Sequence, residues 1–167
     1  ESASDLVFDN PQLATQVYSS LGDAYHRNEN YEKSDKAYQK ALAYDPQNLY
    51  VLNNFSYYLS LRGEHLVKAR QMSAQCVAQE PNNSTYLDTY GWVLYKLENY
   101  EEAEIHLKKA LLLGADESGV VLEHYGDTLF KLGKKEEAIE YWKRAAEKED
   151  HSEELPKKIE AKDLIEH

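Results

Sequence analysis

The chain repeats one arrangement of apolar and small residues about every 34 or 35 positions. The clearest copy runs from Tyr86 to Leu113, where a polar break at Leu97–Asn99 separates two apolar stretches. Large apolar residues recur in both stretches at helical spacing, and Gly91, Ala103 and Ala110 stand among them. A unit of two short helices cannot bury its apolar face alone, so we expect the copies to stack side by side.

Three small-residue positions keep the same register through four units. Their members are Gly22, Ser56, Gly91 and Gly126, then Ser34, Ala69, Ala103 and Ala138, then Ala41, Cys76, Ala110 and Ala145. Successive members are 34 or 35 residues apart, and the one-residue slips fall within 62–67 and 114–119. We expect turns there, because a slip inside a helix would rotate its apolar face by about 100°. Gly114 suits a left-handed helix end.

This register predicts an all-α chain of four helical hairpins. The hairpins are expected at residues 15–48, 49–83, 84–118 and 119–152. Asp45-Pro46 and Glu80-Pro81 are expected to end the second helices of the first two hairpins. The second hairpin is the least regular, because Ser73 stands where a large apolar residue is expected. We expect a gap or a local polar contact at that position.

The two ends of the chain differ from the repeated units. In residues 1–14, Leu6 and Phe8 followed by Pro11 resemble the end of a second helix, which suggests the remnant of a preceding repeat; a disordered leader is the alternative. Residues 153–167 are charged and amphipathic, with Leu155 and Ile159 on one face together with Leu164. We interpret them as a capping helix with a polar outer side, and binding of a partner is the alternative.

The repeated residues resemble the tetratricopeptide repeat, whose pattern is W-x2-L-G-x2-Y…A-x3-F…P with a period of 34. The matching residues are Tyr18, Leu21, Gly22, Tyr25, Ser34, Tyr38 and Pro46 in the first unit, and Leu122, Tyr125, Gly126, Leu129, Ala138 and Trp142 in the fourth. The resemblance covers about residues 15–152. It implies a right-handed α-solenoid of four tetratricopeptide repeats with a C-terminal capping helix.

Two runs, residues 86–95 and 122–127, resemble repeats of bacterial envelope-associated tetratricopeptide proteins, some of which are lipoproteins. This narrower resemblance implies a bacterial source and a periplasmic or cell-envelope location, with the cytoplasm as the alternative. The chain begins at Glu1 and its single methionine is Met72, so we expect it to be a processed or excised piece.

Charge and composition narrow the classes of partner. The formal net charge is −11, so nucleic acid is a poor partner, because phosphate binding needs clustered Lys and Arg. A cationic peptide or basic protein surface fits better, and an acidic surface that only aids solubility is the alternative. No apolar run approaches the roughly 18–20 residues needed to cross a bilayer.

The resemblance also implies that the first helices of the repeats line a concave groove. The residues expected to face it are Asp23, Asn53, Asn54, Tyr57, Asp88, Trp92, Tyr95, Glu123, Asp127 and Phe130. Carboxylates beside exposed aromatic rings suit an extended peptide that carries Lys or Arg, through ion pairs and cation–π contacts. Asn side chains can bond the peptide backbone. The alternatives are that Trp92 and Tyr95 pack against the adjacent repeat and that each Asp is merely solvated.

Candidates for catalysis are weak. The six histidines form no HExxH or similar ligand pair, and a single cysteine, Cys76, excludes an internal disulfide and a cysteine-based metal site. Glu123, His124 and Asp127 form the best polar cluster, but one helix gives too few convergent ligands for a metal. We therefore expect no cofactor, no metal and no enzymatic activity; a metal-dependent enzyme is the most distant alternative.

The sequence thus predicts a non-catalytic protein–protein interaction scaffold that binds a basic or polar peptide or protein segment. The alternative is a structural or oligomerisation domain of a larger bacterial envelope protein. In that case the groove is filled by the part of the protein that precedes Glu1, or by self-association with a second copy.

Overall fold

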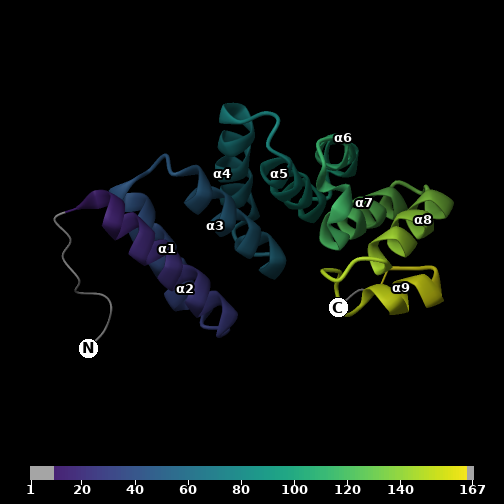
Figure 1. Cartoon of the computed structure of the whole chain (residues 1–167), viewed down its shortest axis with the longest axis horizontal. Helices are drawn as coiled ribbons and strands as arrows, with labels where there is room; N and C mark the ends of the chain where they lie inside the picture. The colour runs from purple at the N-terminus through teal and green to yellow at the C-terminus, as the bar shows by residue number, and fades with distance from the viewer. Residues whose placement is uncertain (1–9, 165–167) are drawn as a thin grey trace.

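The computed structural model describes residues 10–164, so Leu6 and Phe8 of the expected remnant lie outside the described residues, as do residues 165–167. Every regular element within the described range is helical, which confirms the all-α prediction. The elements are α1 Pro11–Arg27, α2 Tyr31–Tyr44, α3 Leu49–Arg62, α4 Leu66–Gln79, α5 Ser84–Lys96, α6 Tyr100–Leu112, the 3₁₀ helix η2 Ala115–Glu117, α7 Gly119–Lys131, α8 Lys135–Ala146 and α9 Leu155–Ala161. Four hairpins and the short α9 follow one another in an arch from the N-terminal to the C-terminal end (Figure 1).

Polar caps and prolines set where the helices begin and end. The side chains of Asn10, Asn48 and Asn83 accept hydrogen bonds from backbone N–H groups in the first turns of α1, α3 and α5. Pro11 is the first residue of α1, where its missing N–H costs nothing. Helix α2 ends at Tyr44 and α4 at Gln79, so both predicted proline stops are confirmed. None of the helices within residues 10–164 combines the length and the apolar character needed to cross a membrane.

The turn inside each hairpin contains a left-handed residue at one fixed register. Glu29, Gly63, Glu98 and Gly133 each lie seven residues after the first small position, and their φ angles are 56°, 67°, 61° and 78°. Left-handed backbone is the natural way to end a helix and reverse the chain. The second hairpin has a further left-handed residue, His65, which accommodates its extra residue. Gly114, with φ 98°, ends α6 before η2, so both predicted slips lie in turns.

The first, third and fourth hairpins close where a glycine on the first helix meets a large residue on the second. A Cβ atom at Gly91 would lie 2.6 Å from Cγ of Leu107, and one at Gly126 would lie 2.6 Å from Cδ1 of Trp142. A Cβ atom at Gly22 would lie 2.8 Å from the ring of Tyr38. These contacts exclude any side chain at the glycines unless the second helix moves away.

The second hairpin has different residues at the crossing of its two helices. Ser56 replaces the glycine and Ser73 replaces the large residue, and both side chains are fully buried. Ser73 Oγ donates to the carbonyl oxygen of Ala69 at 2.8 Å, which confirms the expected local polar contact. Ser56 Oγ bonds the carbonyl oxygen of Leu52 in the same way, at 2.6 Å. At this crossing a serine therefore stands on both helices, and each hydroxyl bonds the carbonyl oxygen four residues before it in its own helix.

Replacing Gly91 by leucine is expected to lower the free energy of unfolding by about 1–3 kcal/mol, because the new side chain collides with buried Leu107. Thr85→Leu adds the same side chain at an exposed position of the same helix and is the matched control. Urea denaturation of both variants measures the difference. Equal stability of the two would show that the assigned crossing point is wrong.

Cys76 gives a second, independent check on the second hairpin. Its side chain is fully buried, and burial raises the pKa of the thiol to about 11. Because the thiolate is the reactive form, we expect reaction with a disulfide reagent at pH 8 to be slowed at least about 100-fold relative to the unfolded chain. Absorbance at 412 nm with Ellman's reagent, in the absence and presence of urea, measures both rates. Rapid reaction of the native protein would contradict the packing of α4 against α3.

Candidate functional site

The ten residues predicted to line a binding surface lie on α1, α3, α5 and α7, the first helices of the four hairpins. We call the side chains presented by these four helices the first-helix face. The predicted residues fall into separate groups along it: one around Asp23, one around Trp92, and one around Glu123 and Asp127. The contacts within each group decide which side chains remain open to a ligand.

Asp23 on α1 is enclosed by tyrosines. Its carboxylate accepts a hydrogen bond of 2.5 Å from the hydroxyl of Tyr38 and longer ones of 3.4 Å from Tyr50 and Tyr58. Burial and the neighbouring Asp23 raise the pKa of Tyr38 above its ordinary value, so this phenol remains a donor. Tyr58 also stacks on His26 at 3.7 Å between ring centroids. The tyrosines therefore already bind the carboxylate that was expected to pair with a basic ligand.

Aromatic rings from three first helices meet in the middle of the chain. Trp92 on α5 stacks on Tyr95, at 4.6 Å between ring centroids, and on His124 of α7, at 3.9 Å. Tyr57 of α3 lies 6.4 Å from the His124 ring. We call these four residues the aromatic patch. Three of its rings are half-buried while that of His124 is buried, so the patch has both a packed side and an accessible side.

Polar groups next to the aromatic patch hold it in place and leave two atoms unpaired. Nδ1 of His124 lies 2.9 Å from Oδ1 of Asp88, and Asp88 is only 8% exposed. Asn53 is buried, and its amide nitrogen contacts Asn54 at 3.4 Å. Within the described residues, neither Asn53 Oδ1 nor Trp92 Nε1 has a hydrogen-bond partner. Both atoms are buried, so a donor and an acceptor lie unpaired beneath the surface of the patch.

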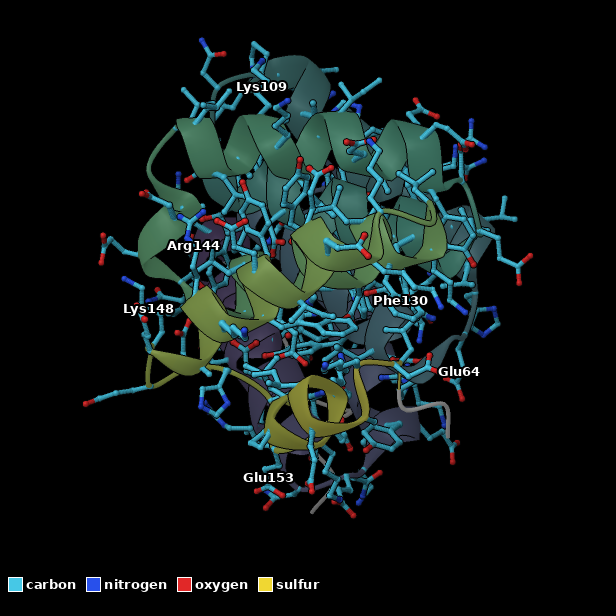
Figure 2. All side chains as sticks on the ribbon, turned by 90° about the vertical axis from the view of Figure 1, so that its right-hand side faces the viewer. Glu64, Lys109, Phe130, Arg144, Lys148 and Glu153 are labelled. Carbon is cyan, nitrogen blue, oxygen red and sulfur yellow. The ribbon has the colours of Figure 1, made fainter. Side chains whose placement is uncertain are left out.

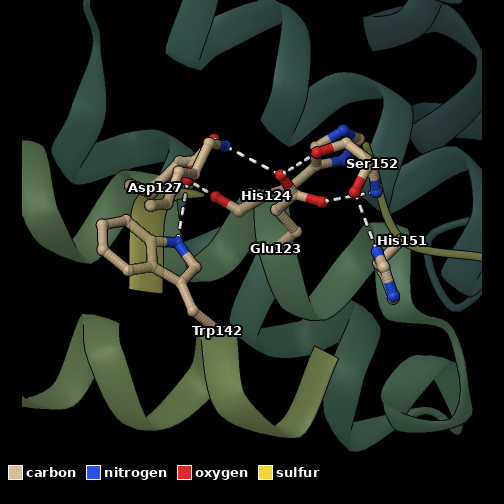
Figure 3. A network of polar contacts seen from close by, with 8 residues as sticks. Glu123, His124, Asp127, Trp142, His151 and Ser152 are labelled. Carbon is tan, nitrogen blue, oxygen red and sulfur yellow. Dashed lines mark hydrogen bonds and ion pairs between the residues drawn. The ribbon is translucent and has the colours of Figure 1, made fainter. Parts of the chain in front are cut away.

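The last two predicted carboxylates form a buried charge cluster with α9. Nζ of Lys158 donates to Glu123 Oε1 at 2.8 Å and to Asp127 Oδ2 at 2.7 Å. Asp127 also accepts from Trp142 Nε1 at 2.8 Å, and Glu123 accepts from both the backbone N–H and the hydroxyl of Ser152, at 2.9 and 2.5 Å (Figure 3). Of these five residues, Ser152 is half-buried and the other four are at least 93% buried. Neither carboxylate is open to a ligand in this state.

The pKa directions in this cluster follow from one cation serving two acids. Burial acts to lower the pKa of Lys158, but Asp127 and Glu123 outweigh it and raise that pKa. Burial also opposes ionisation of Glu123, yet bonds from Lys158 and Ser152 hold its pKa below the ordinary value. Burial raises the pKa of Asp127, and Lys158 offsets this only in part. The ion pairs therefore outweigh burial at Glu123 and Lys158 but not at Asp127.

Phe130 is separate from the aromatic patch. Its ring stacks on Trp142 at 5.4 Å between centroids, and Nζ of Lys135 lies 4.9 Å from its centroid. Viewed from the C-terminal end, α8 and α9 lie in front, and the labelled Glu153 stands at the outer edge of the molecule (Figure 2). Phe130 thus belongs to the packing of the last hairpin.

Sequence reasoning did not single out Lys158, Ser152 or the stacking role of His124. A signal for Lys158 was present: it lies three residues after Leu155 and next to Ile159, on the apolar face of the predicted capping helix. A lysine on the buried side of an amphipathic helix needs a carboxylate partner. Ser152 gives no comparable signal, because it lies between helices and carries no repeat register.

Family models for the tetratricopeptide repeat match residues 15–48, 85–114 and 121–147, which is more than half of the chain. The chain belongs to the tetratricopeptide repeat family. The matched ranges leave out residues 49–83, the hairpin in which Ser56 replaces the glycine and Ser73 replaces the large residue of the other hairpins. Tetratricopeptide repeats typically form protein-interaction scaffolds without enzymatic activity.

Solved tetratricopeptide structures share this fold at low identity. PilF of Pseudomonas aeruginosa is similar with a TM-score of 0.74 and 23% identity, over 91% of this chain and 68% of PilF. PilW, described as a widely conserved type IV pilus biogenesis factor, has a TM-score of 0.70 and 21% identity, over 80% of this chain and 61% of PilW. MamA has a TM-score of 0.65 and 19% identity, over 80% and 72%. No curated protein sequence matches this chain.

Proposed function

We propose that this protein is a non-catalytic scaffold that binds a polypeptide segment across its first-helix face, with the aromatic patch as the main contact. The stack of Trp92 on Tyr95 and His124 is the observation that carries the proposal. It joins two hairpins at the middle of the array, and Tyr57 adds a third. Half-buried aromatic rings give a large contact area with little loss of side-chain freedom on binding, as at other protein interfaces.

The groups beside the patch favour a peptide over a small apolar ligand. The unpaired Asn53 Oδ1 is buried, and it can accept from a peptide N–H once its side chain turns outward. Lys96 Nζ already lies 5.7 Å from the centroid of the Trp92 ring, so the ring can hold a cation on its face.

The preferred ligand is a polar segment with an occasional Lys or Arg. The carboxylates of Asp23, Asp88, Glu123 and Asp127 already have hydrogen-bond or ion-pair partners within the chain. The proposal therefore does not rely on ion pairs between these carboxylates and the ligand. Support for a basic side chain comes from the cation–π capacity of the patch and from the net charge of −11, which steers cationic partners at low salt.

A peptide selected from a random phage-displayed library on the purified protein tests the proposal. Trp92→Ala is expected to weaken its binding about tenfold or more, whereas Val67→Ala, at a 68% exposed position of α4, leaves the affinity unchanged. Fluorescence anisotropy of the labelled peptide measures both. Circular dichroism verifies that both variants stay folded. Peptides that bind equally to both variants would exclude the aromatic patch as the binding surface.

A second candidate function is self-assembly through α1. Leu13, Val17 and Leu21 line a surface groove of about 490 Å³ together with Gln16 and Ser20, and Leu13 is 49% exposed. The residues at the register of Val17 and Leu21 in α3 and α7 are buried under the preceding hairpin; they are Val51, Phe55, Val121 and Tyr125. Nothing within residues 10–164 covers this face of α1.

The occupant we propose for the α1 groove is α6 of a second copy, whose outer side exposes Ile105 (65%) and Leu112 (79%), seven residues apart. Such an arrangement would make the chain a structural or oligomerisation domain, as the sequence allows. Sedimentation velocity should then show a concentration-dependent oligomer that Val17→Asp and Ile105→Asp each abolish. A monomer at all concentrations would rule out this candidate and leave the peptide-binding proposal untouched.

A further inference from the structure

We propose that Glu123 and Asp127 form a binding site for a primary ammonium group, which the chain fills with its own Lys158 and which accepts a lysine from a partner helix when α9 is withdrawn. The site lies at the C-terminal end of the solenoid and shares no residue with the aromatic patch. It therefore stands independently of the peptide-binding role proposed above.

The position of α9 in the array supports the exchange. Polar contacts pass from three of the four first helices, α1, α5 and α7, to the next one in the array at nearly constant separation: Asp23 to Tyr58 over 35 residues, Asp88 to His124 over 36, and Glu123 to Lys158 over 35. Helix α9 thus stands where the first helix of another repeat would stand. The surface beneath it is built to receive a helix, as the corresponding surfaces are in the preceding hairpins.

The site is oriented by residues outside α9. Glu123 and Asp127 are one helical turn apart on α7, so their carboxylates point the same way. Trp142 on α8 holds Oδ1 of Asp127, and Ser152 in the preceding linker holds both oxygens of Glu123. Trp142 belongs to α8 and is independent of α9, whereas Ser152 lies three residues before α9 begins. The two oxygens that contact Lys158 converge on one point.

The chemistry of this point selects an ammonium group. Glu123 and Asp127 are 5% and 4% exposed, and buried carboxylates without a cation are strongly unfavourable. Two oxygens from different carboxylates meet a single nitrogen, which suits the compact, three-donor charge of lysine. The planar fork of arginine instead matches the two oxygens of one carboxylate.

Helix α9 is the part of the chain most readily displaced from this site. It has seven residues, fewer than an isolated helix needs for stability, so tertiary contacts alone hold it. Leu155 and Lys158 are its buried residues, and Ile159 packs in part against the same apolar cluster. Withdrawal of α9 breaks these contacts without unfolding α7 or α8.

The proposed occupant follows from what α9 presents. Leu155, Lys158 and Ile159 lie at i, i+3 and i+4 on one helical face. A partner helix with a lysine between two aliphatic residues at this spacing would make the same contacts. The net charge of −11 favours the approach of a cationic helix.

Three synthetic peptides that copy residues 153–164 test the site. One has the natural sequence, one carries Lys157→Ala and one carries Lys158→Ala, so the last two have identical composition and differ only in which of these two neighbouring lysines remains. Lys157 is exposed in the protein and Lys158 is buried. Fluorescence anisotropy measures their binding to the full wild-type chain and to its Lys158→Ala variant.

The Lys158→Ala protein is expected to bind the natural and Lys157→Ala peptides at least about tenfold more tightly than the wild-type protein does, because its own α9 no longer competes. The Lys158→Ala peptide should bind neither protein. Equal binding of the two alanine peptides, or no binding to a folded Lys158→Ala protein, would overturn the proposal.

Hydrogen exchange of the wild-type protein decides the question if the Lys158→Ala variant does not fold. Excess isotope-labelled natural peptide should accelerate exchange of the amides in 155–161 and leave α6 unchanged. The Lys158→Ala peptide should change neither region. Unaltered exchange in 155–161 with the natural peptide would show that the ion pair only holds α9 in place. It would overturn the proposal that the site accepts a partner helix. Either result leaves the Trp92→Ala test of the aromatic patch unaffected.

Discussion

Lys158→Ala is expected to lower the free energy of unfolding of this protein by about 3–5 kcal/mol. The lysine is 7% exposed and is the cation that contacts both Glu123 and Asp127. Its removal leaves two buried carboxylates without a counter-charge. Urea denaturation followed by circular dichroism at pH 7 measures the effect. Lys157→Ala removes the same side chain from the exposed side of the same helix and should cost less than about 0.5 kcal/mol.

The deficit of the Lys158→Ala variant should shrink in acid. In the wild-type protein the pKa of Glu123 is lowered, so its contribution to stability is present above the ordinary value of 4.5 and is lost as the pH falls through the folded value. In the variant both carboxylates become neutral on acidification, which removes the cost of burying them. The urea denaturation curves of the wild-type protein and the Lys158→Ala variant should therefore lie closer together at pH 4 than at pH 7. A constant separation would indicate that lost packing, rather than charge, causes the effect.

Trp142→Ala is expected to cost about 3–5 kcal/mol as well, for a different reason. The indole is fully buried at the crossing of α7 and α8, close enough to Gly126 that a Cβ there would lie 2.6 Å from it. Truncation leaves a cavity that the glycine cannot fill. It also removes the N–H that donates to Asp127 Oδ1. Thermal or urea denaturation gives the magnitude.

Trp142→Phe separates the two contributions. Phenylalanine retains most of the ring volume against Gly126 and Phe130 but cannot donate to Asp127. A loss of about 1–3 kcal/mol is expected from the buried acceptor alone. Trp92→Phe, at the half-buried tryptophan of the aromatic patch, is the matched control and should change stability little. If Trp142→Phe is as stable as the wild type, the bond to Asp127 contributes nothing to stability.

The fold could be predicted because its information is local and repeated. Gly22, Gly91 and Gly126 occur at one register, and each meets a large residue on the following helix. Turns at the two predicted slips follow from the same register. Ser73 shows the limit of this reasoning: the sequence predicts a gap or a local polar contact there, and the structure is needed to show the polar contact with Ala69.

The candidate site was harder to predict because its contacts join distant parts of the chain. Asp88, Glu123 and Asp127 look like open carboxylates in a helical repeat, yet their partners come from other helices. Residue spacing within a helix gives the direction of a side chain but not the group that meets it. Trp92 packs against His124 of the adjacent repeat, and Trp92 and Tyr95 both stay half-buried. Their place in a binding groove stays a prediction.

The most direct test of the scaffold account is photo-crosslinking in the native host. A benzophenone amino acid replaces Tyr57 or Tyr95 on the first-helix face, or Val67 on an exposed part of α4 as the control. We expect Tyr57 and Tyr95 to crosslink to the same polypeptide, the control to give no such product, and Trp92→Ala to abolish it. Crosslinking that is equal at Val67, or indifferent to Trp92→Ala, would contradict recognition on the first-helix face.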